Sequence, residues 1–208
     1  MKYLILLVCL ISAFKIQAQE RISLRNPSFE GVPGAGVDVP RWYNCGPISE
    51  TPPDIQPGFF GCSLDAIEGK TYLGMITRET GTWESVCEKL SAPLQSGENY
   101  TFSLWLARSE KYLSVTRGTT EKKNFTEPLR LRIWAGEGYC DRAELLDQTT
   151  TVENTDWMPF EFTFSPKKGD WSHLILEAYY QESDQYEQLY SNGNLLIDNC
   201  SSIVKIEK

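Results

Sequence analysis

The sequence has a single histidine, no C-x-x-C pair and no long basic stretch. Zinc sites draw on several cysteine and histidine ligands, so these absences argue against zinc. The one histidine, His173, has no serine or cysteine nucleophile motif to serve. Acidic residues outnumber basic ones by 28 to 20, which disfavours nucleic acid because phosphate binding needs clustered lysine and arginine. Beyond residue 18 no apolar run is long enough for a transmembrane segment.

Residues 1–18 have the pattern of a signal peptide. Lys2 gives a positive start, and residues 3–14 form a nearly continuous apolar run that is too short to span a bilayer. Cleavage is expected before Gln19 and would leave residues 19–208 as one domain. Removal of Lys2 and Lys15 leaves 18 basic against 28 acidic residues. We therefore expect an exported, acidic protein located in the periplasm, at the cell surface or outside the cell.

Five cysteines follow the signal peptide, namely Cys45, Cys62, Cys87, Cys140 and Cys200. Export to an oxidising compartment makes disulfides plausible, and the odd number leaves at least one thiol free or intermolecular. Cys45 and Cys62 flank one loop rich in proline and glycine, which favours a bridge between them. The pairing of the other three stays open.

Short alternations of apolar and polar residues recur between turn signals, while helical periodicity is scarce. This pattern predicts an all-β sandwich. The expected strands are residues 72–77, 85–90, 100–107, 129–134, 160–164, 173–180 and 194–198, the last continuing to 206. The stretch 31–61 has no period and is too long for an ordinary connection, so a functional or disulfide-pinned loop is expected. The polar stretch 108–128 is expected to be a long, mobile loop.

Several short motifs resemble a known family. N-P-S-F-E at 26–30 and L-L-I-D-N at 195–199 resemble the two ends of the galactose-binding-like jelly roll of carbohydrate-binding modules. W-Y-N-C at 42–45 and I-W-A-G at 133–136 resemble the N-terminal module of exported Bacteroidetes proteins that carry an OmpA-like domain. The resemblance spans roughly residues 22–206. It implies a two-sheet antiparallel β-sandwich, the jelly roll, with a binding role.

The same resemblance implies a structural calcium ion that ties the first strand to the last. The matching positions are the carboxylates of Glu30 and Asp198 and the carbonyl of Ser28, with Glu68 and Thr71 from the loop before a central strand. Calcium takes six to eight hard oxygen ligands, some of them from the backbone, so these residue types suit it. The alternative is that these residues are hydrogen-bonded turn residues.

Strand parity also predicts a ligand face. Trp105, Trp134 and Tyr179 lie opposite the apolar faces of their strands, and Arg132 and Glu177 share those faces. Sugars bind by stacking on flat aromatic rings while charged groups hold their hydroxyls. The alternative is that a loop buries these rings on the second face of the sandwich. A different platform is offered by the aromatic residues of the long loop, Trp42, Tyr43, Phe59 and Phe60.

These patterns predict a non-catalytic module that binds carbohydrate or another cell-envelope component. The second reading is a structural or adhesive surface protein that binds a protein partner. The third is a glycan-active enzyme, for which Glu161 and Glu177 would be a candidate carboxylate pair. The oligomeric state stays open.

Overall fold

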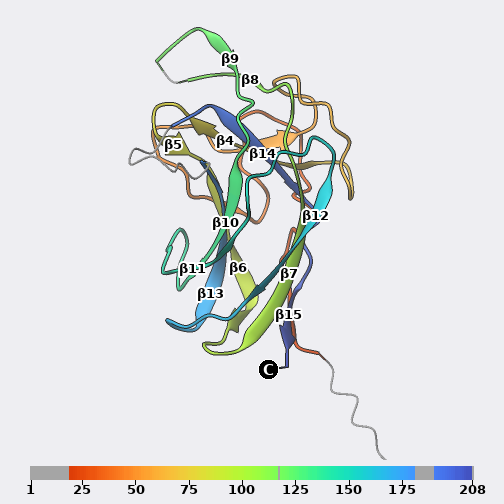
Figure 1. The fold of residues 1–208 in the computed structure, drawn as a ribbon, viewed down its shortest axis with the longest axis vertical. Helices are drawn as coiled ribbons and strands as arrows, with labels where there is room; N and C mark the ends of the chain where they lie inside the picture. Colours follow the sequence, from red (N-terminus) through yellow and green to blue (C-terminus); the bar gives the residue numbers. More distant parts are fainter. Residues whose placement is uncertain (1–18, 117, 181–189, 208) are drawn as a thin grey trace, which may run out of the picture.

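The computed structural model describes residues 19–116, 118–180 and 190–207, so the predicted signal peptide lies outside the described residues. The described chain forms fifteen β-strands, and none of its residues belongs to a helix that could cross a bilayer. Figure 1 shows the hairpin of β8 (Leu113–Val115) and β9 (Lys122–Asn124) at one end and the C-terminus at the other. We call the end with this hairpin the loop end.

Thirteen of these strands build two sheets. The larger sheet follows the order β1-β15-β7-β14-β4-β3, with β12 also paired to β7 and β5 to β4. Its strands are β1 (Arg21–Ile22), β3 (Asp54–Gln56), β4 (Tyr72–Arg78), β5 (Thr82–Trp83), β7 (Asn99–Ala107), β12 (Met158–Phe164), β14 (Gly193–Asp198) and β15 (Ile203–Ile206). The smaller sheet follows the order β11-β10-β13-β6-β2. Its strands are β2 (Tyr43–Asn44), β6 (Ser85–Leu94), β10 (Arg130–Gly136), β11 (Glu144–Gln148) and β13 (Trp171–Tyr179).

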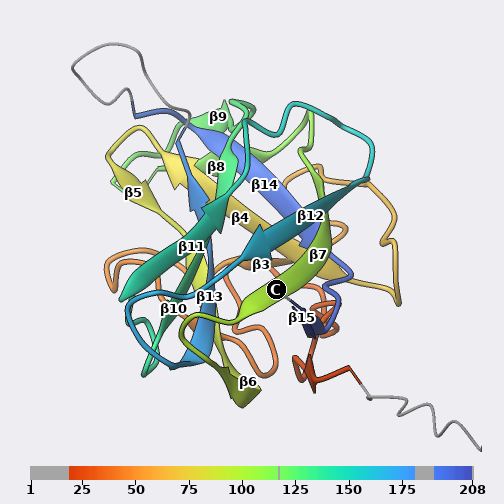
Figure 2. The same cartoon turned by 60° about the horizontal axis from the view of Figure 1, so that its bottom comes forward.

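All pairings between these named strands are antiparallel, so the predicted two-sheet antiparallel β-sandwich is confirmed. The first and last strands pair directly, with Ile22 opposite Ile203. These two strands lie at the end of the molecule opposite the loop end. Figure 2 shows the start of the described chain beside β15.

The main core lies between the sheets and comes from the period-2 pattern of the strands. Successive side chains of a strand point to opposite faces, so every second residue enters the core. Buried core residues are Tyr100, Phe102, Leu104 and Leu106 of β7, Leu131 and Ile133 of β10, and Leu174, Leu176 and Ala178 of β13. Burying one large apolar side chain stabilises the fold by about 1.5–3 kcal/mol.

A second apolar cluster covers the outer face of the eight-stranded sheet. It joins residues of β4 and β14 to residues of the connections, namely Cys62, Tyr72, Ile76, Ala107, Tyr112, Phe125 and Leu196. Strand β4 is therefore buried along its whole length, on both faces. The residues between 108 and 128, expected to be a mobile loop, instead supply Tyr112, Phe125 and the β8–β9 hairpin to this cover. That expectation was wrong because apolar residues spaced this irregularly leave no periodic signal.

The predicted Cys45–Cys62 bridge was wrong, and Cys45 is bonded to Cys140 instead. Cys45 directly follows β2 of the five-stranded sheet, whereas Cys62 follows β3 of the other sheet and lies 3.3 Å from the hydroxyl of Tyr72. The loop that separates them in sequence thus crosses from one sheet to the other. Cys62, Cys87 and Cys200 are free and buried.

Candidate functional site

Four of the five residues predicted to bind ligand meet on the outer face of the five-stranded sheet. Antiparallel pairing of β10 with β13 sets Arg132 opposite Glu177 and Arg130 opposite Tyr179, so Tyr179 points to the same face as Glu177. Trp134 follows two residues after Arg132 and therefore points to the same face. The sequence parity that predicted this grouping is confirmed for these four residues.

The carboxylate of Glu177 organises this face. Its side chain is only 2% exposed, and both of its oxygens are used. Oε1 accepts a hydrogen bond from the indole Nε1 of Trp134 at 3.0 Å, and Oε2 accepts one from Nε of Arg142 at 2.6 Å. Nη1 of Arg132 lies 3.9 Å from Oε1. A buried carboxylate needs such partners, because an unpaired charge would be strongly destabilising.

The two arginines and the aromatic rings stay partly open to solvent. The side chain of Arg132 is 25% exposed and that of Arg142 is 30% exposed. The guanidinium carbon of Arg132 lies 3.3 Å from the centroid of the Tyr179 ring, and Trp83 packs edge-on against the same ring at 5.2 Å. These contacts fix the ring of Tyr179 and the plane of Arg132 relative to Trp134.

Arg142 is a member of this face that the sequence analysis missed. It follows the disulfide-bonded Cys140, and its Nη2 donates to Ser85 Oγ at 2.7 Å and to the carbonyl of Cys45 at 3.4 Å. The segment that carries it folds back tightly, since a Cβ on Gly136 would lie 2.0 Å from the carbonyl oxygen of Asp141. No sequence signal could have placed Arg142 here, because its position depends on the Cys45–Cys140 bond.

Two exposed tyrosines extend the face beyond β10 and β13. Tyr43 of β2 and Tyr139 are 56% and 51% exposed, and their ring centroids lie 5.2 Å apart. Tyr139 also packs on the ring of His173 at 4.7 Å. Trp42, an alternative platform residue, is instead buried and donates its indole N–H to the carbonyl of Asn26 at 2.8 Å.

Trp105 does not join this face. It lies on β7 in the eight-stranded sheet, opposite Pro159 and Asp198, so the predicted strip of three aromatic rings does not form. The parity argument was sound for each strand but could not tell which sheet a strand enters. Glu161 is likewise on β12 of the eight-stranded sheet, so it does not pair with Glu177.

The five residues predicted to bind calcium converge at the start of the chain and the end of β14. Glu30 accepts hydrogen bonds at Oε1 from the backbone N–H groups of Lys70 and Thr71, at 2.9 and 3.0 Å. Oδ2 of Asp198 accepts two more from the loop before β4, including the N–H of Glu68 at 3.2 Å. Segments that are distant in sequence therefore meet at this position.

Ser28 and Glu68 also belong to this set of five residues, and Oγ of Ser28 donates a hydrogen bond to Oε2 of Glu68 at 3.0 Å. Burial and, to a smaller extent, the nearby charge of Glu30 raise the pKa of Asp198 to about 6, although hydrogen bonds from three backbone N–H groups act in the opposite direction. Within the described residues no three His, Cys, Asp or Glu side chains converge tightly enough to hold a metal alone. A cation here would therefore draw on carboxylates together with carbonyl and hydroxyl oxygens, a donor set that suits calcium.

A buried polar cluster at the loop end was not predicted. Nη2 of Arg78, the last residue of β4, lies 2.5 Å from Oε1 of Glu84, and its Nε lies 3.5 Å from Oε2 of Glu50. Asp54 of β3 accepts a short hydrogen bond from the hydroxyl of Tyr112 and interacts electrostatically with Arg78. Each of these residues lies at one end of a strand or in a connection, where a polar side chain is ordinarily exposed to solvent.

Comparison with protein-family models and with curated proteins finds no match for the sequence. Among solved structures, an apo-form cyclase from Fischerella sp. is 15% identical over 90% of this chain and 97% of that chain, with a TM-score of 0.55. An arabinose-bound α-L-arabinofuranosidase is 12% identical over 89% of this chain and 26% of that chain, with a TM-score of 0.54. A xylan-binding domain from Paenibacillus barcinonensis is 14% identical over 92% and 97%, with a TM-score of 0.49.

The likeness is one of fold. At such low identities the first two matches show a shared all-β architecture and carry nothing about ligand or activity. The third, with a TM-score below 0.5, adds no support. The resemblance to modules of OmpA-associated proteins is not tested by these matches and stays a prediction.

Proposed function

We propose that this protein is an exported, non-catalytic module that binds carbohydrate on the outer face of its five-stranded sheet. The observation that carries the proposal is the Glu177 network. One buried carboxylate holds the indole of Trp134 and the guanidinium group of Arg142 through hydrogen bonds, with Arg132 close by. These groups are thereby fixed before any ligand arrives.

Such a preorganised face suits a sugar. The apolar side of a pyranose ring packs on aromatic rings, and guanidinium groups beside the rings donate hydrogen bonds to its hydroxyls. Here partly exposed rings of Trp134 and Tyr179 lie beside Arg132 and Arg142, with the exposed Tyr43 further along the same face. Because the Glu177 network already orders these side chains, binding loses little side-chain entropy.

Two further features support the proposal. Glu161 and Glu177, the carboxylates considered as a glycosidase pair, lie on different sheets, which favours binding over hydrolysis. The Cys45–Cys140 disulfide is typical of proteins that work in an oxidising compartment and so supports export.

The structural calcium belongs to the same proposal. The side-chain carboxylates of Glu30, Glu68 and Asp198, with the backbone carbonyl oxygens of Ser28 and Thr71, would hold the ion. The chemistry it would supply is charge neutralisation where carboxylates crowd at a largely buried position.

The test is substitution of Trp134 by alanine, with Trp105→Ala as the matched control. Both residues are half-buried tryptophans on outer strand faces, but only Trp134 lies on the proposed face. A glycan array first identifies a ligand, and calorimetry then measures affinity. Trp134→Ala should weaken binding at least tenfold, about 1.4 kcal/mol, and Trp105→Ala should leave it unchanged.

Circular dichroism and thermal melting confirm that both variants are folded. Equal losses in the two variants, or glycan binding unchanged by Trp134→Ala, would contradict the proposed face. Absence of any glycan ligand together with capture of a defined protein partner would support the adhesive reading instead. Turnover of chromogenic glycosides would identify an enzyme.

A further inference from the structure

Two arginines on the outer face of the five-stranded sheet, the proposed binding face, share one carboxylate. Nε of Arg142 lies 2.6 Å from Oε2 of Glu177, and Nη1 of Arg132 lies 3.9 Å from Oε1. Among the described residues Glu177 is the only acidic partner of either arginine. Because its side chain is 2% exposed and both of its oxygens are occupied, Glu177 balances one positive charge and leaves the other uncompensated.

The loop-end cluster shows the opposite balance of charge. Nη2 of Arg78 pairs with Glu84, and its Nε pairs with Glu50. Asp54 is a third nearby carboxyl group that interacts electrostatically with this guanidinium group. On the sheet face two arginines meet one glutamate, although the whole sequence has 28 acidic against 20 basic residues. This local excess of positive charge indicates that a bound ligand supplies the second negative charge.

Each of the two arginines is held at two of its three nitrogens and keeps the third one open. Arg132 is held at Nε by Oε1 of Gln148, at 3.4 Å, and at Nη1 by Glu177. Arg142 is held at Nε by Glu177 and at Nη2 by Oγ of Ser85. No described residue accepts a hydrogen bond from Nη2 of Arg132 or Nη1 of Arg142. Neither nitrogen is among the buried atoms that lack a partner, so both are open to solvent and to a ligand.

The setting of Arg132 favours an anionic acceptor over a hydroxyl group. The ring of Tyr179 covers one face of its guanidinium group, with the guanidinium carbon 3.3 Å from the ring centroid. The ligand is therefore left the edge of the plane, where the N–H groups match the oxygens of a carboxylate or a tetrahedral oxyanion. Hydrogen bonds to such ionised acceptors are roughly twice as strong as those to neutral ones.

The nearest exposed acidic residues lie farther along the sheet. Glu137 directly follows Gly136, and Asp141 packs against Gly136 and accepts a hydrogen bond from the N–H of Glu137 at 3.1 Å. Gly136 is four residues from Arg132 on the same strand, a distance of about 13 Å. Charges this far apart are largely screened at physiological ionic strength, where the Debye length is about 8 Å. The net negative charge of the chain therefore does not prevent an anion from binding at the two arginines.

We propose that the glycan bound on this face carries an anionic group, a carboxylate or a sulfate ester, that binds at the open nitrogens of Arg132 and Arg142. This inference rests on the proposed function and narrows the sugar to an acidic one. Trp134 lies two residues after Arg132 on β10, and Tyr179 lies opposite the residue two before it. The sugar ring that carries the anion thus has an aromatic ring on either side of the arginine.

The experiment compares polysaccharides that differ only in charge. Calorimetry measures the affinity for polygalacturonate and for its full methyl ester, which has the same sugar units without the charge. Dextran sulfate and dextran are the second pair and distinguish a sulfate from a carboxylate. In at least one pair the charged member should bind at least tenfold more tightly than the neutral one. Poly-L-glutamate presents carboxylates without a sugar ring and should bind more weakly than the preferred glycan.

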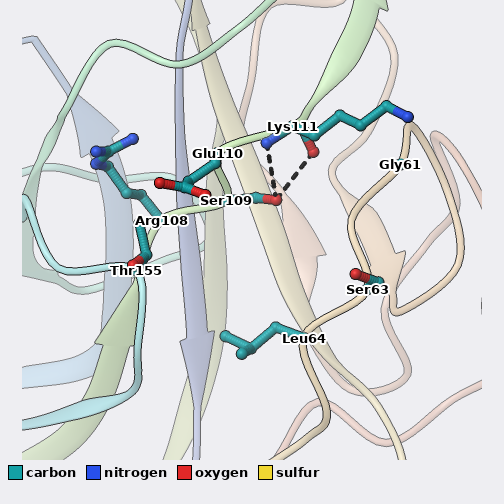
Figure 3. Close-up of a pocket in the computed structure, with 8 residues that line it drawn as sticks. All are labelled: Gly61, Ser63, Leu64, Arg108, Ser109, Glu110, Lys111 and Thr155. Atoms are coloured by element: carbon teal, nitrogen blue, oxygen red, sulfur yellow. Dashed lines mark hydrogen bonds between the residues drawn. The ribbon is translucent and has the colours of Figure 1, made fainter.

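Arg132→Gln should reduce this preference to less than threefold, because it removes the uncompensated charge and leaves the aromatic rings in place. Arg108→Gln is the matched control, since it removes the same charge from another partly buried arginine, which directly follows β7 of the other sheet. Figure 3 shows Arg108 and Glu110 lining a separate pocket of about 410 Å³. Arg108→Gln should keep the full preference. If Arg132→Gln does not fold, added sodium chloride decides, because it should weaken binding of the charged glycan and not of its neutral counterpart.

The outcomes separate this inference from the proposed function. Equal affinity for both members of each pair, or a preference that Arg132→Gln leaves unchanged, would overturn the acidic ligand, while loss of neutral-glycan binding in Trp134→Ala would still support the sheet face. Equal losses in Arg132→Gln and Arg108→Gln, or equal affinity for poly-L-glutamate, would show that charge alone is recognised and would also overturn it. Failure of every glycan to bind would overturn the proposed function and this inference with it.

Discussion

Asp54 is a carboxyl group whose acidity is set by its burial. It is 5% exposed, and burial raises its pKa to about 6, although hydrogen bonds from Tyr112 and from the N–H of Gly36 act in the opposite direction. An unfolded aspartate titrates near 3.8. The folded protein therefore holds the Asp54 proton over a range of pH in which the unfolded chain has lost it.

This difference predicts a pH-dependent effect of Asp54→Asn. The stability that Asp54 contributes is fully present below pH 3.8 and is lost as pH rises to about 6. One pKa unit corresponds to about 1.4 kcal/mol, so the loss is at most about 3 kcal/mol. Asparagine does not titrate, so the free energy of unfolding of Asp54→Asn relative to that of the wild type should rise between pH 4 and pH 7.

Urea unfolding of both proteins at the two pH values measures this change. A stability difference that is constant with pH would mean that Asp54 titrates alike in the folded and unfolded chains.

The loop-end cluster shows why single residues resist prediction from sequence. Arg78 and Glu84 are six positions apart, and nothing in their local pattern distinguishes them from solvated turn residues. Their contact depends on the hairpin of β4 and β5, in which Thr77 pairs with Trp83. The burial of Arg78 further depends on residues 48–51 and on β8, which arrive from distant parts of the chain.

At the scale of elements, strands with strict alternation could be predicted. The expected ranges 100–107 and 173–180 correspond to β7 (Asn99–Ala107) and β13 (Trp171–Tyr179), because one face of each enters the core. The hairpin of β8 and β9 could not, since its three-residue strands are mostly polar and only partly buried. Sheet membership, which separated Trp105 from the proposed binding face, likewise cannot be read from the pattern of a single strand.

The Cys45–Cys140 bond is expected to stabilise both the fold and the proposed binding face. It closes a loop of 95 residues, which corresponds to roughly 4–5 kcal/mol in the chain-entropy model. Replacing both cysteines by serine should lower the free energy of unfolding by up to that amount. Because the bond also positions Arg142 against Glu177, the double variant should bind glycan more weakly even below its melting temperature.

Chemical denaturation measures the first effect and calorimetry with the glycan measures the second. Peptide mapping without reduction should recover Cys45 linked to Cys140, and the double variant Cys87→Ser, Cys200→Ser is a control that leaves the bond intact. Recovery of Cys45 and Cys140 as free thiols from native, oxidised protein would contradict the assignment.

At the scale of the whole molecule, the proposed calcium site joins the beginning of the chain to its last third. A ligand that binds only the native state stabilises it by mass action, by about 2.7 kcal/mol at a hundred times its dissociation constant. EDTA should therefore lower the melting temperature, and calcium should restore it. Asp198→Asn should abolish this response because it removes a carboxylate that the ion needs.

Magnesium at the same concentration is the control, since it demands a smaller, octahedral site. A melting curve that EDTA leaves unchanged, together with no calcium by elemental analysis, would exclude the site.

Strand β15 pairs with both β1 and β7, so the seam of the eight-stranded sheet joins two segments about 180 residues apart in the chain. Among the described strands β1 pairs only with β15, so this edge of the sheet stays open until Ile203 and Val204 have been synthesised. Pairings this distant in sequence also form slowly, because the chain entropy of closing them is lost before their contacts form. The eight-stranded sheet can therefore close only after nearly the whole described chain has been synthesised, which makes this closure a late step of folding.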